Sequence, residues 1–317
     1  MDSGDATSAL LQELRPNALA IAYRMLGSVS DAEDVVQEGL LRLHAALDRG
    51  DEIDSPGAYL ATVVTRLCID ELRSARLRRE RYVGEWLPEP VVGTAAEELA
   101  GQPDFSARPE LLDSLGMAFL VLLETLTPEQ RAVLLLRDVF DYGYDEVARI
   151  LGKSEVACRQ IAVRARARVL ERRPRFDVRP EQQEELAERF FSAVEHGELD
   201  ALEALLAEEV SLHGDGGGKV PALARALHGR STVARTLLHW RHNAERAGGF
   251  RFERTRVNGQ PGALIRSAEG ALVGVWSIDL AEGRVAAIRS IVNPDKLRHL
   301  GSTLDLGSWL RRGEHRG

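Results

Sequence analysis

Apolar positions in the first half of the chain recur every three or four residues, which is the period of amphipathic helices. We expect a helix over about 9–26, a second helix that begins at a capping box of Ser30 and Glu33, and a third that begins at Pro56. The periodicity fails over 84–109, where prolines, glycines and acidic residues alternate. This composition predicts a linker.

A second helical segment follows the linker. Thr127, Pro128 and Gln130 combine an N-cap, a proline at the first helical position and a capping-box glutamine, so they predict a strong helix start. Two helices expected over 144–151 and 155–170 are separated by a Gly-Lys-Ser turn. This spacing is the helix-turn-helix arrangement, whose second helix enters the major groove of DNA.

The buried side of that second helix is expected to be a stripe of Cys158, Ile161, Ala165 and Val169. The other faces of the helix are rich in arginine. An ordinary helical hairpin with solvated arginines is the alternative interpretation.

The pattern changes again in the last third of the chain. Leu186, Phe190 and Val194 lie four residues apart and predict an amphipathic helix. Beyond Gly249 the alternation is that of strands, with a turn expected at Glu282-Gly283. Helices followed by an antiparallel sheet predict an α+β domain.

Charge refines this picture when it is divided by segment. The net charge of −8 argues weakly against nucleic-acid binding. However, 72–82 carry five arginines and one acidic residue, and 159–175 carry seven arginines and one acidic residue. In contrast, 1–57 carry 11 acidic and 4 basic residues. The distribution of charge, not its total, decides a DNA footprint, so the two arginine-rich helices predict separate DNA contacts.

The acidic helix before them suits a basic protein partner, although acids at a helix N-terminus also compensate the helix dipole. The sequence has no apolar run of 18 residues and no signal peptide, so we expect a cytoplasmic protein without membrane contact. Cys68 and Cys158 predict neither a disulfide framework nor a metal site, and no cofactor is expected.

Motifs in three of these segments resemble those of a known protein family. The stretch 30–47, with its Asp-Ala-Glu-Asp-Val-Val-Gln-Glu core, resembles region 2 of extracytoplasmic-function (ECF) sigma factors, where this helix binds core RNA polymerase. The stretch 69–73 resembles the part of region 2 that opens and reads the minus-10 element, and 126–172 resembles region 4, which reads the minus-35 element. Arg66 departs from the pattern, because many members of the family carry Asn there.

The resemblance implies three sets of contact residues. Core RNA polymerase would contact Asp31, Asp34, Val35, Gln37, Glu38 and Leu41. The minus-10 element of promoter DNA would contact Arg66, Asp70, Arg73, Arg76 and Arg79. The minus-35 element would contact Ser154, Glu155, Arg159, Gln160, Val163, Arg164, Arg166 and Arg168.

Three further strings are similar to the signature of a sigma-factor group called ECF41. They are Trp86-Leu87-Pro88-Glu89-Pro90, Asp215-Gly216-Gly217-Gly218-Lys219 and Asn293-Pro294-Asp295-Lys296-Leu297. The C-terminal domain of that group is SnoaL-like, a curved antiparallel sheet with helices that close a cone. The resemblance implies that this domain tunes the sigma factor in cis, without a separate anti-sigma factor. The first string could instead plug its own domain, and the second could be a flexible hairpin loop.

The predicted fold is multidomain: two all-α sigma domains, which are the region 2 helical bundle and the region 4 helix-turn-helix, and then an α+β SnoaL/NTF2-like cone-shaped domain. The expected boundaries are 1–83 for region 2, 84–110 for the acidic linker, 111–176 for region 4, 180–300 for the SnoaL-like regulatory domain and 301–317 for a C-terminal tail.

The predicted function is that of an alternative sigma factor that directs core RNA polymerase to specific promoters. An enzyme is not expected, because the sequence shows no acid/base pair with a defensible spacing. A small ligand of the C-terminal domain remains a candidate partner, with pocket candidates His213, Asp215, His239, Trp240, Trp276 and Arg289. A one-component regulator with a ligand-sensing domain, or a DNA-binding protein fused to a SnoaL-like enzyme, is the alternative. Neither explains the acidic helix and the first arginine-rich helix together.

Overall fold

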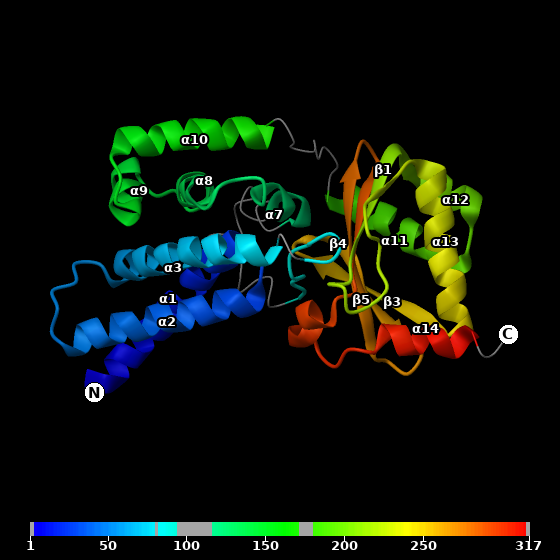
Figure 1. Ribbon diagram of the computed structural model, residues 1–317, viewed down its shortest axis with the longest axis horizontal. Coiled ribbons are helices and arrows are strands. Elements are labelled where there is room, and N and C mark those ends of the chain that lie inside the picture. The colour runs from blue at the N-terminus through cyan, green and yellow to red at the C-terminus, as the bar shows by residue number, and fades with distance from the viewer. Residues whose placement is uncertain (1–2, 80–81, 94–115, 171–179, 315–317) are drawn as a thin grey trace. The chain divides into compact units, whose positions relative to one another are not determined.

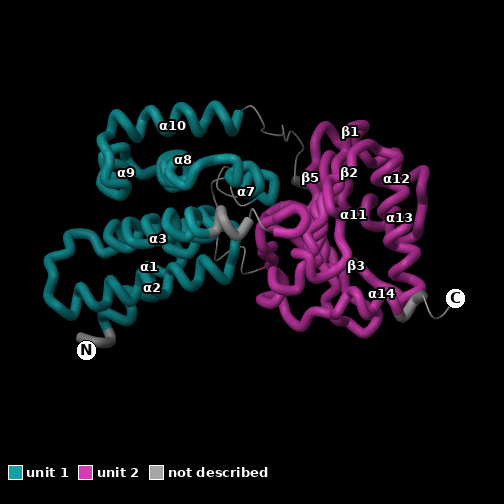
Figure 2. Tube along the Cα trace, in the orientation of Figure 1, with its two compact units in different colours: residues 1–80, 94–173 teal, residues 81–93, 174–317 magenta. Residues whose placement is uncertain are grey.

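The computed structural model describes residues 3–79, 82–93, 116–170 and 180–314 (Figure 1). The chain divides into two compact units, which Figure 2 colours separately. Unit 1 combines 1–80 with 94–173, and unit 2 combines 81–93 with 174–317. The short segment 81–93 therefore folds with the C-terminal part of the chain.

The N-terminal helices of unit 1 pack on one another as a bundle. They are α1 Ser3–Leu26, α2 Val29–Asp48 and α3 Pro56–Arg79. The predicted capping box at Ser30 is wrong, because the N-cap of α2 is Ser28, whose hydroxyl accepts the Asp31 amide at 3.2 Å. Ser28 has extended backbone angles, whereas Ser30 already lies inside the helix, so only Ser28 can fill the cap position.

The apolar stripe of α2 faces the bundle. Val36 and Leu43 are buried there, as the helical spacing predicts. Gly39 lies on the same face, where a Cβ would be only 2.9 Å from Val64 Cγ2 of α3. Glycine thus allows α2 and α3 to approach each other closely.

The second helical part of unit 1 has the predicted capping box at its centre. Thr127 Oγ1 accepts the Gln130 amide at 3.2 Å, and Gln130 Oε1 accepts the Thr127 amide at 3.0 Å. The described helices are α7 Met117–Leu123, α8 Pro128–Leu134, the π-helix η1 Leu135–Val139, α9 Tyr144–Leu151 and α10 Glu155–Leu170.

A buried arginine joins the two helical parts of unit 1. Arg131 Nη1 donates to the carbonyl oxygen of Met25 at 2.6 Å, and its Nε and Nη2 donate to the carbonyl oxygen of Leu123. Burial lowers the pKa of Arg131 to about 9. The Glu124 carboxylate lies 2.9 Å away and supplies a charge partner. Removal of this side chain would take its donors away from two buried carbonyl groups, those of Met25 and Leu123.

The described residues of unit 2 form a six-stranded sheet in the order β2-β1-β6-β5-β4-β3. The strands are β1 Leu206–Asp215, β2 Leu227–His228, β3 Phe250–Val257, β4 Gln260–Ser267, β5 Leu272–Ala281 and β6 Arg284–Ile291. The helices are α11 Pro180–His196, α12 Leu199–Leu205, α13 Arg230–Arg246, the 3-10 helix η2 Pro294–Leu300 and α14 Leu306–Glu314.

The α+β class is confirmed, but the expectation of a wholly antiparallel sheet after the helices is wrong. β1 and β2 precede α13, and β1 pairs with β6 in parallel. The alternation of Val210 and Leu212 indicates a strand, but two apolar residues also fit a continuation of the preceding helix. The strand β1 is fixed by its pairing with the last strand, β6, which local sequence does not reveal. The predicted turn at Glu282-Gly283 is present, with both residues at positive φ.

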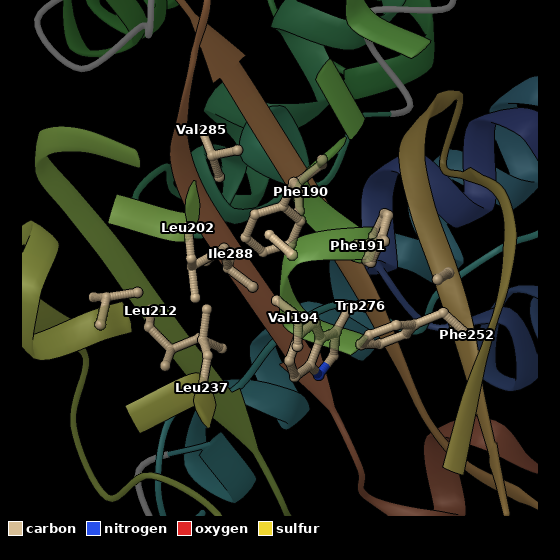
Figure 3. Packing of buried hydrophobic residues seen from close by; sticks show 14 of the residues in the cluster. Phe190, Phe191, Val194, Leu202, Leu212, Leu237, Phe252, Trp276, Val285 and Ile288 are labelled. Atoms are coloured by element: carbon tan, nitrogen blue, oxygen red, sulfur yellow. The ribbon is translucent and has the colours of Figure 1, made fainter. Parts of the chain in front are cut away.

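The core of unit 2 lies between one face of the sheet and the helices. Figure 3 shows Phe190 and Val194 of α11 pointing toward Trp276 and Ile288 of the sheet. Because side chains alternate along a strand, the neighbouring residues of β1, β5 and β6 face the other side of the sheet. Among the described helices, none combines the length and apolar character that a membrane-crossing segment needs.

Candidate functional site

The residues predicted to contact polymerase are distributed over α2. Asp34, Gln37, Glu38 and Leu41 are exposed and share one face, at i, i+3, i+4 and i+7, while Asp31 and Val35 are half-buried. The acidic face thus carries a large exposed apolar side chain. This combination suits a partner surface that presents both basic and apolar groups.

The predicted minus-10 residues of α3 have partners within unit 1. Arg66 Nε donates to the carbonyl oxygen of Ile150 at 2.8 Å, and its Nη2 donates to that of Arg149 at 3.2 Å. A cation at the carbonyl end of α9 also compensates the helix dipole. Arg73 pairs with Asp70 at 3.2 Å. The side chains of Arg76 and Arg79 lie outside the described residues.

The predicted helix-turn-helix is present. Gly152 ends α9 in the left-handed conformation with φ 62°, and Ser154 Oγ accepts the Ala157 amide at 3.2 Å to start α10. The buried stripe differs from the expected one, because Cys158, Ala162 and Ala165 are fully buried whereas Ile161 and Val169 are only half-buried. Small residues at the centre of the stripe let α10 pack closely on α8.

The outer face of α10 carries most of the predicted minus-35 residues. Those that are exposed are Ser154, Glu155, Arg159, Gln160, Val163, Arg164 and Arg168. Arg159 is paired with Glu155 at 3.1 Å. Val156, which the sequence reasoning missed, is 66% exposed, and Val163 is 65% exposed. Exposed valines on a recognition helix suit the methyl groups of thymine.

Two of the predicted DNA-contacting arginines are held by other parts of unit 1. Arg166 Nε donates to Asp138 Oδ2 at 2.8 Å, and this carboxylate raises the pKa of the guanidinium. Arg168 Nη1 donates to the carbonyl oxygen of Thr125 at 3.0 Å. Both side chains therefore have structural partners that a contact with phosphate would have to replace or share.

The three signature strings meet in unit 2, on the face of the sheet opposite the helices. We call residues 82–93 the strap. Leu87 and Val91 are buried, as are Pro88, Glu89 and Pro90 between them. The proline residues keep this stretch extended, so its polar backbone groups are available to the domain it lies on.

Asp215 at the end of β1 is the acceptor that holds the strap. Its side chain is 0% exposed. Oδ2 accepts the Leu87 amide at 2.8 Å, and Oδ1 accepts the Tyr82 hydroxyl at 2.5 Å and the Gly217 amide at 3.1 Å. Burial and this carboxylate together raise the pKa of Tyr82. These donors offset the hydration that the carboxylate loses on burial.

Lys296 in η2 completes the site. Its side chain is 6% exposed, and Nζ lies 2.7 Å from Asp215 Oδ2. The ammonium also donates to the carbonyl oxygen of Leu87. It lies 4.1 Å from the centre of the Trp86 ring and 5.1 Å from that of Tyr82. The strap therefore surrounds this cation with one carbonyl oxygen and two aromatic faces.

The glycine string and the asparagine string contact each other beside this ion pair. Asn293 Nδ2 donates to the Tyr82 hydroxyl at 2.8 Å, and Asn293 Oδ1 caps η2 by accepting the Asp295 amide at 3.1 Å. Gly217 has φ +60°, and a Cβ there would overlap the Asn293 amide. Lys219 pairs with Asp295 on the exposed side. Only glycine allows the loop to pass this close.

The strap has further partners that the sequence reasoning missed. Val91 and Asn258 exchange two hydrogen bonds, of 3.0 and 2.7 Å, at the turn between β3 and β4. The His299 ring donates to the carbonyl oxygen of Pro90 at 2.7 Å, and Glu85 lies 2.8 Å from the His213 ring. Each of these partners is an isolated polar residue in the sequence. A single polar residue does not predict a contact with a distant segment.

A cavity of about 300 Å³ lies on the other face of the sheet, within the cone that the helices close. Of the predicted pocket residues, His239, Trp240 and Trp276 line it. The placement of the other three in a pocket is wrong, because His213, Asp215 and Arg289 lie on the strap side of the sheet. Among the described residues that line the cavity, none is Asp or Glu. This leaves no carboxylate for acid/base chemistry there.

Two family models match the chain. The model described as Sigma-70 region 2 matches residues 10–78, and the model described as Sigma-70, region 4 matches residues 116–169. The first span contains α2 and all but the last residue of α3, and the second contains all but the last residue of the helix-turn-helix.

Relatives match over almost the whole length. The chain is 38% identical over 296 residues to the ECF RNA polymerase sigma factor SigJ of Mycobacterium tuberculosis, covering 90% of this chain and 91% of the relative. It is 32% identical over 310 residues to the probable ECF RNA polymerase sigma factor SigI of the same species, covering 97% and 100%. A crystal structure of M. tuberculosis SigJ superimposes with a TM-score of 0.71 at 34% identity and covers 92% of this chain and 98% of that one.

Proposed function

Because the chain belongs to the extracytoplasmic-function family of RNA polymerase sigma factors, which direct core polymerase to promoters, we propose that its C-terminal domain regulates this activity in cis through the strap. The observation that carries the proposal is the buried pair of Asp215 and Lys296, which holds the strap on unit 2. The family is not enzymatic.

The position of the strap in the chain explains how such control would work. The strap lies in the connection between α3 of region 2 and α7 of region 4. This connection has about 37 residues and would reach roughly 120 Å when extended. When the strap is held, only about 23 residues remain between it and α7, with a reach of roughly 75 Å. Docking of the strap thus ties the middle of this connection to the C-terminal domain, directly after α3 and about 23 residues before α7.

The other contacts follow the predicted roles. The exposed face of α2 binds core polymerase, and the outer face of α10 reads the minus-35 element in the major groove. The side chains of α3 contact the minus-10 element. For Arg66 this role requires the loss of its hydrogen bonds to α9, so it acts only after the two helical parts separate. The contact between α3 and α9 supports a restrained state in the protein alone.

This arrangement makes a separate anti-sigma factor unnecessary, because the restraint is covalently attached. The protein acts in the cytoplasm, where core polymerase and promoter DNA are. The linker that follows the strap is acidic, which keeps it away from DNA.

Transcription in vitro with purified core polymerase tests the proposal. In the full chain, Leu87→Asp places a charge where a fully buried side chain anchors the strap, and Val83→Asp adds the same charge at an exposed strap position. We expect Leu87→Asp to raise promoter output several-fold at equal holoenzyme concentration. Val83→Asp should behave like the parent.

The outcomes separate the parts of the proposal. Equal output from all three proteins would refute control through the strap. A loss of output by Leu87→Asp, with polymerase binding intact, would mean that the docked strap belongs to the active form. Polymerase binding is measured in the same reactions, so that a folding defect is not mistaken for regulation.

A further inference from the structure

The described lining of the cavity inside the cone has five Trp and Phe side chains together with aliphatic ones. Trp276 and Phe252 come from the sheet, Trp240 from α13 and Trp309 from α14, and Phe250 lies at the start of β3. The Phe252 and Trp276 ring centres are 5.1 Å apart, and those of Trp240 and Trp276 are 6.2 Å apart. Figure 3 shows Phe252, Trp276 and Leu237 around this part of the core. Such walls favour a flat apolar molecule.

The charges around the cavity are already compensated. Arg241 is the one Lys or Arg among the described lining residues. Its Nε donates to the carbonyl oxygen of Glu195 at 2.8 Å, and Nη2 lies 3.6 Å from the Glu245 carboxylate. An ionised ligand would therefore lose its hydration without gaining a counter-ion. This loss of hydration favours a neutral ligand over an anion or a cation.

The polar groups of the lining are few. Ser290 Oγ already accepts the Trp276 Nε1–H at 2.9 Å. His239 Nε2 and Asn243 Nδ2 are 3.0 Å apart, and both residues belong to the outer part of α13. This pair offers one hydrogen-bonding position to a ligand at the edge of the cavity.

We propose that the cavity binds a neutral, flat aromatic molecule, whose single polar group meets the His239 and Asn243 pair. A volume of about 300 Å³ is at the lower end for small-molecule sites, so the ligand has roughly 15–20 non-hydrogen atoms. The inference goes beyond the proposed function and does not depend on it, because binding is measured without polymerase.

Titration of the full chain with N-phenyl-1-naphthylamine tests this site. The probe is neutral, joins a naphthyl and a phenyl ring through one N–H group, and is of the expected size, and its fluorescence rises in apolar surroundings. Its anionic relative, 1-anilinonaphthalene-8-sulfonate, is the charge control. We expect one bound molecule of the neutral probe per chain and binding of the sulfonate at least ten-fold weaker.

Variants decide whether the probe occupies this cavity. Ala244→Phe adds a ring at a lining position of α13, and His242→Phe adds the same ring at an exposed position of that helix. Ala244→Phe should weaken binding at least ten-fold, and His242→Phe should change it less than two-fold. Ala222→Trp, on the exposed lining loop before β2, is the second blocking variant if Ala244→Phe does not fold. Unchanged binding by a folded blocking variant, or equal binding of the sulfonate, overturns the proposal.

Discussion

Replacement of Lys296 by methionine is the sharpest test of how unit 2 holds the strap. Methionine keeps most of the apolar volume and removes the ammonium group. Asp215 would then be a buried carboxylate that keeps its hydrogen bonds from Leu87, Gly217 and Tyr82 but loses its ion pair with Lys296. The Trp86 and Tyr82 rings would lose their cation at the same time.

The expected cost follows from burial of both charges. Breaking a buried ion pair by removal of one partner typically costs about 3–5 kcal/mol. The remaining donors to Asp215 reduce this cost, and the lost cation–π contacts add to it. We therefore expect Lys296→Met to lower the free energy of unfolding of unit 2 by about 3 kcal/mol. With a urea m-value of about 2 kcal/mol/M, the midpoint falls by roughly 1.5 M.

Tryptophan fluorescence reads this change in unit 2 alone. All tryptophans of the sequence lie within unit 2, at positions Trp86, Trp240, Trp276 and Trp309. Urea unfolding followed at this signal is therefore insensitive to unit 1. Arg256→Met is the matched control, because Arg256 forms an exposed pair with Glu184 at 2.6 Å. That change should cost no more than about 1 kcal/mol.

A double-mutant cycle identifies the pair as the cause. Asp215→Asn alone should also destabilise unit 2 by about 3 kcal/mol, because it removes the carboxylate that pairs with the buried Lys296 ammonium. The double variant should be more stable than the sum of the single losses predicts, by about 2 kcal/mol. Additive losses, or a loss from Lys296→Met no larger than that from Arg256→Met, would refute the reasoning.

The remaining predictions concern pH, the glycine loop and the thiols. The pKa of Tyr82 is raised in the folded state, so its contribution to stability is complete below about pH 10 and declines as the pH rises further. Tyr82→Phe should therefore reduce the loss of stability above about pH 10, measured by urea unfolding followed with tryptophan fluorescence. Gly217→Ala should lower the urea midpoint of unit 2 more than Gly283→Ala, because both glycines have positive φ but only the first would press a Cβ on a neighbour. Burial raises the pKa of the Cys68 and Cys158 thiols, so neither should react with a disulfide reagent at pH 8 until urea unfolds unit 1, and rapid labelling of the native protein would contradict this.

Local patterns in the sequence were sufficient to predict most of the helix starts and turns. The helix start at Thr127, the Gly152 turn of the helix-turn-helix and the Glu282-Gly283 hairpin were predictable, because a cap or a turn is decided by a few consecutive residues. The start of α2 was misplaced by two residues, since serines at 28 and 30 offer similar caps and only the backbone conformation distinguishes them.

The partners of those elements required the tertiary structure. The parallel pairing of β1 with β6, and the contact of Arg66 with the end of α9, join segments separated by some 80 residues in the chain. Periodicity carries no information about such pairs, because it describes which face of an element is buried but not what covers it. A predicted DNA-contacting residue was thus found to have a partner inside the protein.

The sequence by itself predicted the family of this protein, its helix-turn-helix and the three strings that are shared between the strap and the C-terminal domain. Only the tertiary structure decided that Leu87, Asp215 and Lys296 form one buried site, because their hydrogen bonds close loops of 81 to 209 residues. It also placed the strap and the aromatic cavity on opposite faces of the same sheet. Gly214 lines the cavity while its neighbour Asp215 holds the strap, since consecutive side chains of a strand point to opposite sides.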